Sequence, residues 1–553
     1  MKKYFKIKII APLVAAVMLS TSCGDSFLDI NDNPNAPASA SLDLLLTGAE
    51  VASAFWTSRT MMENSSIYAG HWYELGASTY NVSPGDTSND FDGIYTSALK
   101  EYAAIEVQSD EQELQGYRGI ARVMKAYLFS ILVDNFGDVP YTEALQGENI
   151  LFPKYDDDAA IYASLLQLID DAKADLVAAD TEGEIVTGDL VYGGDLASWI
   201  KAANTIKLRL YINMRLVDAS GSTAGISALI AEDDFIDDND DNFQFFFGST
   251  AAPLNRHPVY HQDYVAGNKA FYQSNYFMYK LWSKNDPRLP YYIFRQGDFD
   301  DMEFDTTPCS NLPAGTCVFW ELLCDGCNAD VNAPTNTAAT GYIGRDPGDA
   351  SGIPGDNTIR ATFGVYPVGG SYDDGSGGDR SSTSATRSGG LGAGVIPWMT
   401  SSMRAFMLAE SALMLGTAGD ARALFEEGIR ESMADVSAVS VGITGSNAVA
   451  MVAADIDAYV ANQLVEYDAA VAITNEAALD VVITEKHAAC FGNGFESYND
   501  LRRTGYPGDL PDALVPTGPF PSRFQLPVTA EGGLNPNAPD PAALISEPVF
   551  WDI

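Results

Sequence analysis

The sequence is short of basic residues. Its 553 residues include 32 Lys and Arg against 75 Asp and Glu, which gives a formal net charge of -43. So acidic a surface is unsuited to the phosphates of a nucleic acid or to acidic membrane lipids. Histidine is scarcer still, with four in the chain and no His-Glu-x-x-His pair, so a hydrolytic zinc site has little support. We therefore expect no nucleic-acid partner, no bound metal and no cofactor.

The hydrophobic run near the N-terminus is too short to span a membrane. It extends from Ile9 to Leu19, and the small polar residues Ser20–Ser22 follow it before Cys23. Four lysines precede or open the run: Lys2, Lys3, Lys6 and Lys8. A membrane span needs about 20 apolar residues, so residues 1–22 are predicted to be a secretion signal peptide.

A signal peptide that ends in small residues followed by cysteine resembles the lipobox of bacterial lipoproteins, in which the cysteine is acylated and becomes the first mature residue. Leu19 lies one place further from Cys23 than usual, with Ser20 in the leucine position. The resemblance predicts lipidation at Cys23 and a Pro/Asn-rich tether over residues 23–41, so that the lipid alone would hold the protein at a membrane. The alternative is an ordinary cleavage nearby that leaves Cys23 a free thiol.

Cysteine is rare but clustered. Of the five cysteines after Cys23, four are Cys309, Cys317, Cys324 and Cys327. In an exported protein this cluster predicts two disulfides, in one of three pairings. A structural zinc site with four cysteine ligands is the alternative. Cys490 is then expected to be an unpaired, buried thiol.

Helical periodicity is the dominant pattern in the rest of the sequence. Apolar residues recur at helical spacing from Tyr117 to Leu132, ending at Gly137, and again after the capping candidates Asp156–Asp158 and Asp195. Long helices with short turns favour antiparallel packing. From about residue 297 to 394 the periodicity gives way to Gly, Pro, Ser, Asp and Thr, which predicts a long loop-rich insertion. The acidic run Asp233–Asp241 lacks the glycine and glutamate of an EF-hand and is interpreted as a solvated turn.

Helical periodicity is expected to return at Pro397. A helix is predicted over Ser401–Leu415, and Asp420 is expected to cap a second one. The segment Leu413–Ile429 resembles half of a tetratricopeptide repeat, with small residues where two helices approach and an aromatic between them. The predicted fold is therefore mainly α, with a tetratricopeptide-like helical scaffold and a loop-rich insertion.

Several motifs carry a more specific resemblance. The segment Thr484–Pro507 looks like the C-terminal hallmark of the SusD/RagB family of outer-membrane lipoproteins. Other matches follow the family in the same order along the chain: Asn33-Pro34-Asn35, Phe136–Tyr141, Asn285–Arg288, Ala409-Glu410 and Pro521–Pro527.

This resemblance implies a single nutrient-binding domain over residues 42–553 on a helical scaffold. It also implies a role: a lipoprotein on the outer face of the outer membrane that binds an oligosaccharide or another nutrient and delivers it to a TonB-dependent transporter of the SusC type.

Sugar binding requires flat aromatic faces beside short polar groups. His71 is followed by Trp72 and Tyr73, and a loop then brings Tyr80 and Asn81, so these four form the first candidate site. The further candidates lie in or beside the insertion: Trp320, Tyr366, Tyr372 and Trp398. The alternative for each aromatic is a place in the core. Arg502 and Arg503 are expected to pair with carboxylates such as Glu496 rather than to contact ligand.

No catalytic residues are predicted, and the chain is expected not to be an enzyme. Two alternatives stay open. A surface glycosidase would use paired carboxylates, and with so many acidic residues the sequence offers many pairs. A structural interaction protein on a helical-repeat scaffold would bind no small ligand.

Overall fold

Helices make up most of the described chain, as predicted. The computed structural model describes residues 40–74, 80, 85–265, 271–295, 319, 323, 341–349, 360–375, 389–514, 519–527, 531–539 and 546–553. The α-helices are α2 (Leu42–Thr57), α3 (Thr60–Tyr68), α4 (Ser88–Gly93), α5 (Lys100–Gln112), α6 (Gln115–Phe136), α7 (Asp158–Glu182), α8 (Leu196–Met214), α9 (Ala219–Glu232), α10 (Pro258–Tyr264), α11 (Asn275–Ser283), α12 (Leu289–Tyr292), α14 (Ser401–Leu415), α15 (Ala421–Gly442), α16 (Ala453–Val471), α17 (Asn475–Ala489), α18 (Gly494–Thr504) and α19 (Glu531–Leu534). Short helical turns are η2 (Ile94–Leu99, a π-helix), η3 (Gly147–Asn149) and η4 (Asn239–Asp241).

Short strands join segments that are far apart in the sequence. Within the described residues they form antiparallel pairs of β1 (Trp72–Glu74) with β3 (Phe271–Gln273), β2 (Phe243–Phe246) with β6 (Val395–Met399), and β4 (Ile293–Phe294) with β5 (Thr362–Phe363). The strand β6 occupies Pro397, where a return to helix was expected. That expectation is wrong, and the helix begins at Ser401.

The helix boundaries follow the capping residues of the sequence. The Asp157 carboxylate accepts a hydrogen bond from the backbone N–H of Ala160 and starts α7. Asp195 does the same for Ala197 at the start of α8. The helix α6 ends at Gly137, which adopts a φ of 77°, a left-handed conformation that glycine reaches without strain. The predicted starts of these helices are confirmed.

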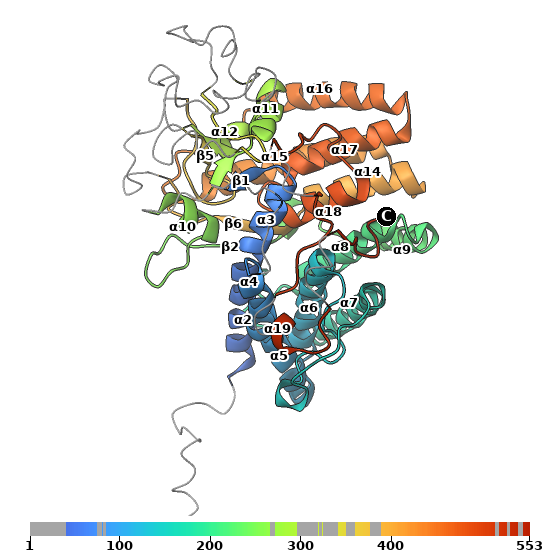
Figure 1. Ribbon diagram of the computed structural model, residues 1–553. Helices are drawn as coiled ribbons and strands as arrows, with labels where there is room; N and C mark the ends of the chain where they lie inside the picture. Colours follow the sequence, from blue (N-terminus) through green and yellow to red (C-terminus); the bar gives the residue numbers. More distant parts are fainter. Residues whose placement is uncertain are drawn as a thin grey trace, which may run out of the picture.

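Consecutive long helices pack as neighbours in two groups. Figure 1 shows α6–α9 in green and teal below the orange group α14–α17, with the short strands, α11 and α12 on the far side from the free ends of α14–α17. A Cβ atom at Gly428 of α15 would lie 2.8 Å from the ring of Phe406 on α14, so only glycine allows this approach. Phe425 is buried between the helices and stacks on Tyr467 at 5.2 Å. The tetratricopeptide-like pairing is therefore confirmed for α14 and α15.

Part of the predicted insertion belongs to the residues that the structure describes. Residues 341–349 and 360–371 have little regular structure besides β5 and are buried, so they belong to the interior rather than to an exposed loop. Cys309, Cys317, Cys324 and Cys327 lie outside the described residues, as does Cys23. Cys490 is a buried free thiol, as expected.

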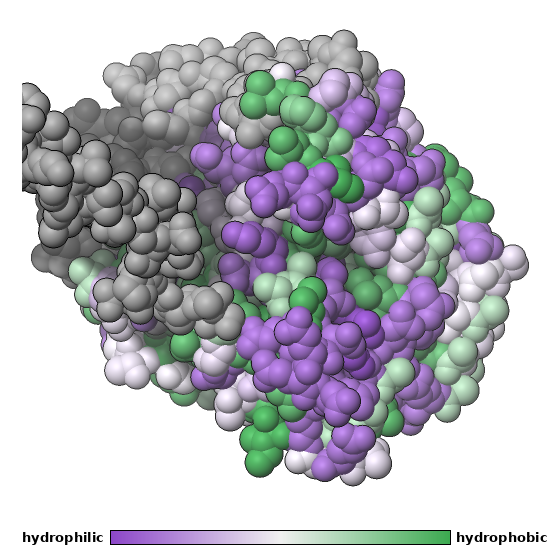
Figure 2. Space-filling view, turned by 90° about the horizontal axis from the view of Figure 1, so that it is seen from below, coloured by the Kyte–Doolittle hydropathy of each residue, from purple (hydrophilic) through white to green (hydrophobic). Residues whose placement is uncertain are grey.

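The surface is mixed in polarity. Figure 2 shows hydrophilic residues over much of the coloured face, interrupted by separate hydrophobic groups. Within the described part of the chain, no helix combines the length and the hydrophobicity that crossing a bilayer requires.

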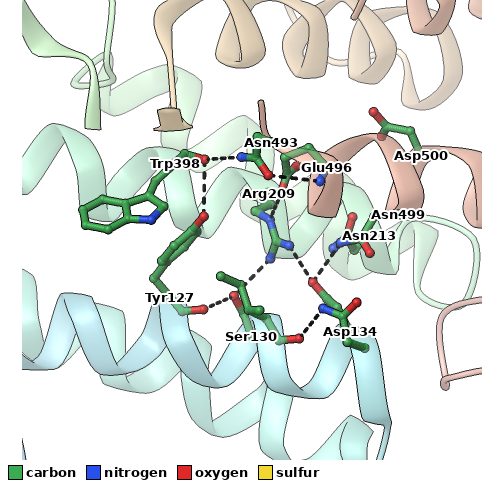
Figure 3. A network of polar contacts seen from close by, with 12 residues as sticks. Tyr127, Ser130, Asp134, Arg209, Asn213, Trp398, Asn493, Glu496, Asn499 and Asp500 are labelled. Carbon is green, nitrogen blue, oxygen red and sulfur yellow. Dashed lines mark hydrogen bonds and ion pairs between the residues drawn. The ribbon is translucent and has the colours of Figure 1, made fainter. Parts of the chain in front are cut away.

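Buried ion pairs connect the segments that carry the family-like motifs. Arg209 on α8 pairs with Asp134 on α6 at 2.6 Å and with Glu496 on α18. It also donates a hydrogen bond to Ser130 at 3.0 Å. Figure 3 shows these groups pointing toward one another between the helices. A buried charge is stable only when it is paired in this way, so this network fixes how α6, α8 and α18 meet.

The two C-terminal arginines differ in their partners. Arg503 pairs with Glu410 and with Asp500, so its predicted carboxylate pairing is confirmed. Arg502 instead donates to backbone carbonyl oxygens, including that of Ser522 at 2.6 Å, and lies over the Tyr498 ring at 4.0 Å. The partner named from the sequence, Glu496, is wrong for both arginines because Arg209 already occupies it.

One buried carboxyl group predicts a pH dependence of stability. Glu63 on α3 is buried and accepts a hydrogen bond from Gln262. Burial, and then the neighbouring Asp90, raise its pKa to about 8. Because this folded-state pKa lies above the unfolded value, the stability that the protonated group provides is full below about pH 4.5 and is lost as the pH rises through about 8.

Glu63→Gln should therefore flatten the profile. Between pH 6 and pH 8 we expect the wild-type chain to lose roughly 2 kcal/mol more stability than this variant. Chemical unfolding at each pH measures the difference. The exposed α5 substitution Glu111→Gln is the control. Parallel profiles for wild type and Glu63→Gln would contradict the assignment.

Candidate functional site

The first predicted aromatic platform lies in the core. Trp72 is 1% exposed and its ring packs edge-on against Phe363 at 5.0 Å and Phe491 at 5.5 Å. Tyr73 is buried as well, with its hydroxyl group 3.5 Å from that of Ser274. Neither ring offers a face to a ligand, so their assignment to a binding site is corrected. The pairing of β1 with β3 carries both residues into the interior.

Two of the insertion candidates are also buried. Tyr366 is 2% exposed and its hydroxyl group lies 3.3 Å from Asp435. Trp398 on β6 is 1% exposed, and its indole N–H donates to Thr57 at 2.9 Å. Both rings stabilise the core, and the prediction that they contact ligand is corrected for the same reason.

Of the remaining candidates, the structure describes Tyr80 and Tyr372, and neither is fully buried. Tyr80 is half-buried and its ring lies 5.5 Å from that of Phe520. Asn81 and Trp320 lie outside the described residues. Tyr372 is half-buried, and it lines a pocket.

This pocket has a volume of about 440 Å³, within the range of small-molecule sites. One wall is the ring of Tyr372 beside that of Tyr291 on α12, with centroids 4.9 Å apart and planes at 57°. Another part of the lining is the segment Val449–Val452, together with Asp455 and Asn462 of α16. The Tyr291 hydroxyl group donates to the carbonyl oxygen of Val449 and so joins the two walls.

The motif Asn285–Arg288 forms the rigid base of the pocket. Asn285 takes a left-handed φ of 54°, which asparagine tolerates better than most residues. Arg288 is fully buried, pairs with Asp286 at 2.6 Å and Glu485 at 3.1 Å, and lies 5.8 Å from the ring centre of Tyr459. The Tyr459 hydroxyl group also donates to Glu485, at 2.8 Å. These contacts hold α12 and α16 in fixed positions around the pocket.

The side chains of Tyr291 and Tyr372 are uncharged. Burial raises the pKa of both Tyr291 and Tyr372. Burial alone would lower the pKa of Lys284, but Glu485 and Glu466 more than offset that effect and raise it. The pocket therefore combines neutral aromatic faces with amide, carboxylate and carbonyl oxygens, a composition that suits a polyhydroxylated ligand with apolar ring faces.

A second pocket of about 430 Å³ lies between η2 and the segment from Pro140 to Pro153. Its walls are mainly apolar, with Phe91, Leu145 and Ile150 among them, and the Tyr95 hydroxyl group donates to the carbonyl oxygen of Pro140. Asp92, Thr96 and Lys100 add polar groups to this lining, but none of the aromatic residues predicted from the sequence to contact ligand lines it.

Two clusters of aspartate side chains are each compact enough to be considered as a metal site. In one, Asp157 and Asp158 accept hydrogen bonds from backbone N–H groups around the start of α7. In the other, Asp237 and Asp241 pair with Lys201 at 2.9 and 2.5 Å. Lys201 therefore pairs with two carboxylates of the acidic run, and these contacts within the chain give both clusters structural roles.

The sequence did not single out Tyr291, Asp455 or Asn462. Tyr291 is the third residue after the Asn285–Arg288 motif, and an aromatic residue close behind a rigid turn could have been noted. Asp455 and Asn462 lie in an ordinary polar stretch of helix, and only the fold brings them to the aromatic wall.

The fold and the site together define a helical scaffold protein with a pocket of small-ligand size. Residues 34–307 match the family described as "Starch-binding associating with outer membrane", and residues 382–516 match the family described as "Susd and RagB outer membrane lipoprotein". The chain belongs to the SusD/RagB family of outer-membrane lipoproteins. A comparison with curated proteins gave no match.

Solved structures share the fold at low sequence identity. A chitin-binding protein superposes with a TM-score of 0.67 at 20% identity, covering 93% of this chain and 100% of that one. A chitin-binding SusD homologue from Flavobacterium johnsoniae gives 0.63 at 19% identity, covering 92% and 98%. A SusD homologue from Bacteroides fragilis gives 0.64 at 18% identity, covering 93% and 99%.

Proposed function

We propose that this chain is a lipoprotein on the cell surface that binds a glycan and delivers it to a TonB-dependent transporter of the SusC type. The observation that carries the glycan-binding part is the pocket whose lining combines the rings of Tyr291 and Tyr372 with Asp455 and Asn462. Aromatic faces accept the apolar sides of sugar rings, and amide and carboxylate groups accept or donate to hydroxyl groups.

Family membership supports the remaining parts of the proposal. The SusD/RagB description as an outer-membrane lipoprotein agrees with lipidation at Cys23, a tether over residues 23–41 and an outward-facing position. Two structural neighbours are described as chitin-binding, which favours a glycan over other nutrients. Delivery to a transporter of the SusC type is part of the same proposal, and the outer-membrane description of the family supports it.

The pocket favours binding over hydrolysis. A glycosidase requires two carboxyl groups flanking the scissile bond. Among the described residues that line the pocket, Asp455 is the one carboxylate. Tyr80, with the nearby Asn81, remains a second proposed contact, as does Trp320.

Tyr372→Ala tests the site. We expect it to weaken binding of a glycan selected from an array by about tenfold, since losing one aromatic stacking face costs on the order of 1.4 kcal/mol. The melting temperature should change little because Tyr372 is half-buried. Titration calorimetry measures the affinity, and chromatography of the same mixture tests for hydrolysis products.

The half-buried tyrosine of α8, Tyr211, lies outside the pocket lining and gives the control Tyr211→Ala. Equal affinities for wild type and Tyr372→Ala would move the site elsewhere. Release of shorter sugars would favour the glycosidase alternative.

A further inference from the structure

The pocket has two charged side chains in its lining, Lys284 and Asp455. They differ in whether another group already neutralises them, and this difference bears on the charge of the ligand.

The lysine is neutralised from outside the pocket. Lys284 Nζ lies 2.9 Å from both Gln463 Oε1 and Glu466 Oε2, and 3.8 Å from Glu485 Oε1. The next cation behind the base, Arg288, is fully buried and pairs with Asp286 and Glu485. To reach a ligand carboxylate, Lys284 would have to give up its exposed partner Glu466. Arg288 would have to leave the buried Asp286 and Glu485 without their cation, which is costly.

The carboxylate of Asp455 differs from Lys284 in this respect. Asp455 is exposed in the first turn of α16. Within the described residues it forms no ion pair with a lysine or arginine. The rings of Tyr291 and Tyr372 are neutral. The pocket therefore presents one uncompensated negative charge, on a chain whose formal net charge is -43.

We infer that this pocket accepts glycans that are uncharged or carry a primary amine, and discriminates against glycans that carry carboxylate or sulfate groups. An anionic group entering beside Asp455 would lose hydration without gaining a cationic partner, and like charges at short range repel. A neutral or amine-bearing sugar meets no such cost. The inference rests on the proposed function and specifies its ligand class.

Two pairs of probes, each pair sharing one sugar backbone, test the charge preference. Oligogalacturonate of six residues and its fully methyl-esterified form differ in charge at every ring, and chitohexaose and its de-N-acetylated form supply a neutral and an amine-bearing pair. For the folded mature chain we expect the acid to bind at least tenfold more weakly than its ester. The de-N-acetylated probe should bind at least as tightly as chitohexaose, and added salt should reduce both differences.

Two charge variants on α16 separate the local effect from the overall field. Asp455→Lys should raise the ratio of acid to ester affinity by tenfold or more. Asp457→Lys makes the same change in net charge outside the pocket lining, where Asp457 pairs with Arg430, and it should change that ratio less than twofold. Thermal melting confirms that both variants fold.

The outcomes distinguish the two proposals. Equal or tighter binding of the acid by the wild-type chain overturns the charge preference and leaves glycan binding intact. Equal shifts in the two lysine variants assign the preference to the overall charge and overturn the role of Asp455. If none of the four probes nor any array glycan binds, the proposed function itself fails.

Discussion

Replacing Arg209 with methionine is expected to lower the free energy of unfolding by about 3–5 kcal/mol. The substitution keeps most of the side-chain volume but removes the cation that pairs with both Asp134 and Glu496, and Glu496 keeps Lys486 at 3.9 Å. Among the described residues, the Asp134 carboxylate then accepts from neutral donors, namely the hydroxyl group of Tyr162 and the N–H groups of Asn499 and Trp551. A buried carboxylate that loses its cation pays a large desolvation cost, so the loss exceeds that of the removed contacts.

A second substitution tests whether the buried carboxylates cause the loss of stability. Arg209→Met combined with Glu496→Gln removes one of the two carboxylate charges that pair with Arg209 and should recover part of the lost stability, as a coupled pair does in a double-mutant cycle. The exposed pair of Arg422 with Asp468, at 2.7 Å, supplies the control Arg422→Met, whose melting temperature should hardly change. Denaturant unfolding measures all three. Similar losses for Arg209→Met and Arg422→Met would contradict a supporting role for the buried network.

The sequence predicted the long helices because their evidence is local. The caps Asp157, Asp195 and Asp420 and the break at Gly137 are each read within a few residues. Apolar periodicity over several turns then leaves little choice of conformation. The short strands were missed since two to five residues carry no measurable period, and their partners lie far along the chain.

The site was harder to predict because exposure is a property of the fold. Tyr366 and Tyr372 lie six positions apart in the same Gly-rich segment and look alike in the sequence. The first reaches into the core toward Asp435, while the second remains half-buried against Tyr291. Similarly, the hydrogen bond between Tyr291 and Val449 spans 158 residues, so no local pattern could have joined the two walls of the pocket.

The same limit applies to the buried charges. Glu496 was the natural partner for Arg502 and Arg503 because it is their neighbour in the sequence. In the fold it faces Arg209, from which 287 positions separate it. A motif predicts which residue types must be paired, but only the packing of α8 against α18 determines the pairs.

The second large effect is expected from Trp72. Trp72→Ala should lower the free energy of unfolding by about 3–5 kcal/mol, since it removes a large ring from a closed core and leaves a cavity. The neighbouring rings of Phe363 and Phe491 would lose their edge-on contacts with it. Denaturant unfolding measures this loss, and calorimetry on the fraction that stays folded measures glycan affinity.

The control on the same residue type is Trp282→Ala on α11, because Trp282 is 39% exposed. It should cost clearly less stability than Trp72→Ala, since more of its surface already contacts water. In the folded fraction of Trp72→Ala we expect glycan affinity within twofold of the wild type, because the ring does not reach the pocket lined by Tyr291 and Tyr372. A stable Trp72→Ala chain with strongly weakened binding would restore Trp72 as a stacking platform. It would also show that the ring leaves the core in solution. A destabilised chain with unchanged affinity would instead separate the two aromatic groups by role, with Trp72 holding the scaffold and Tyr372 contacting the sugar.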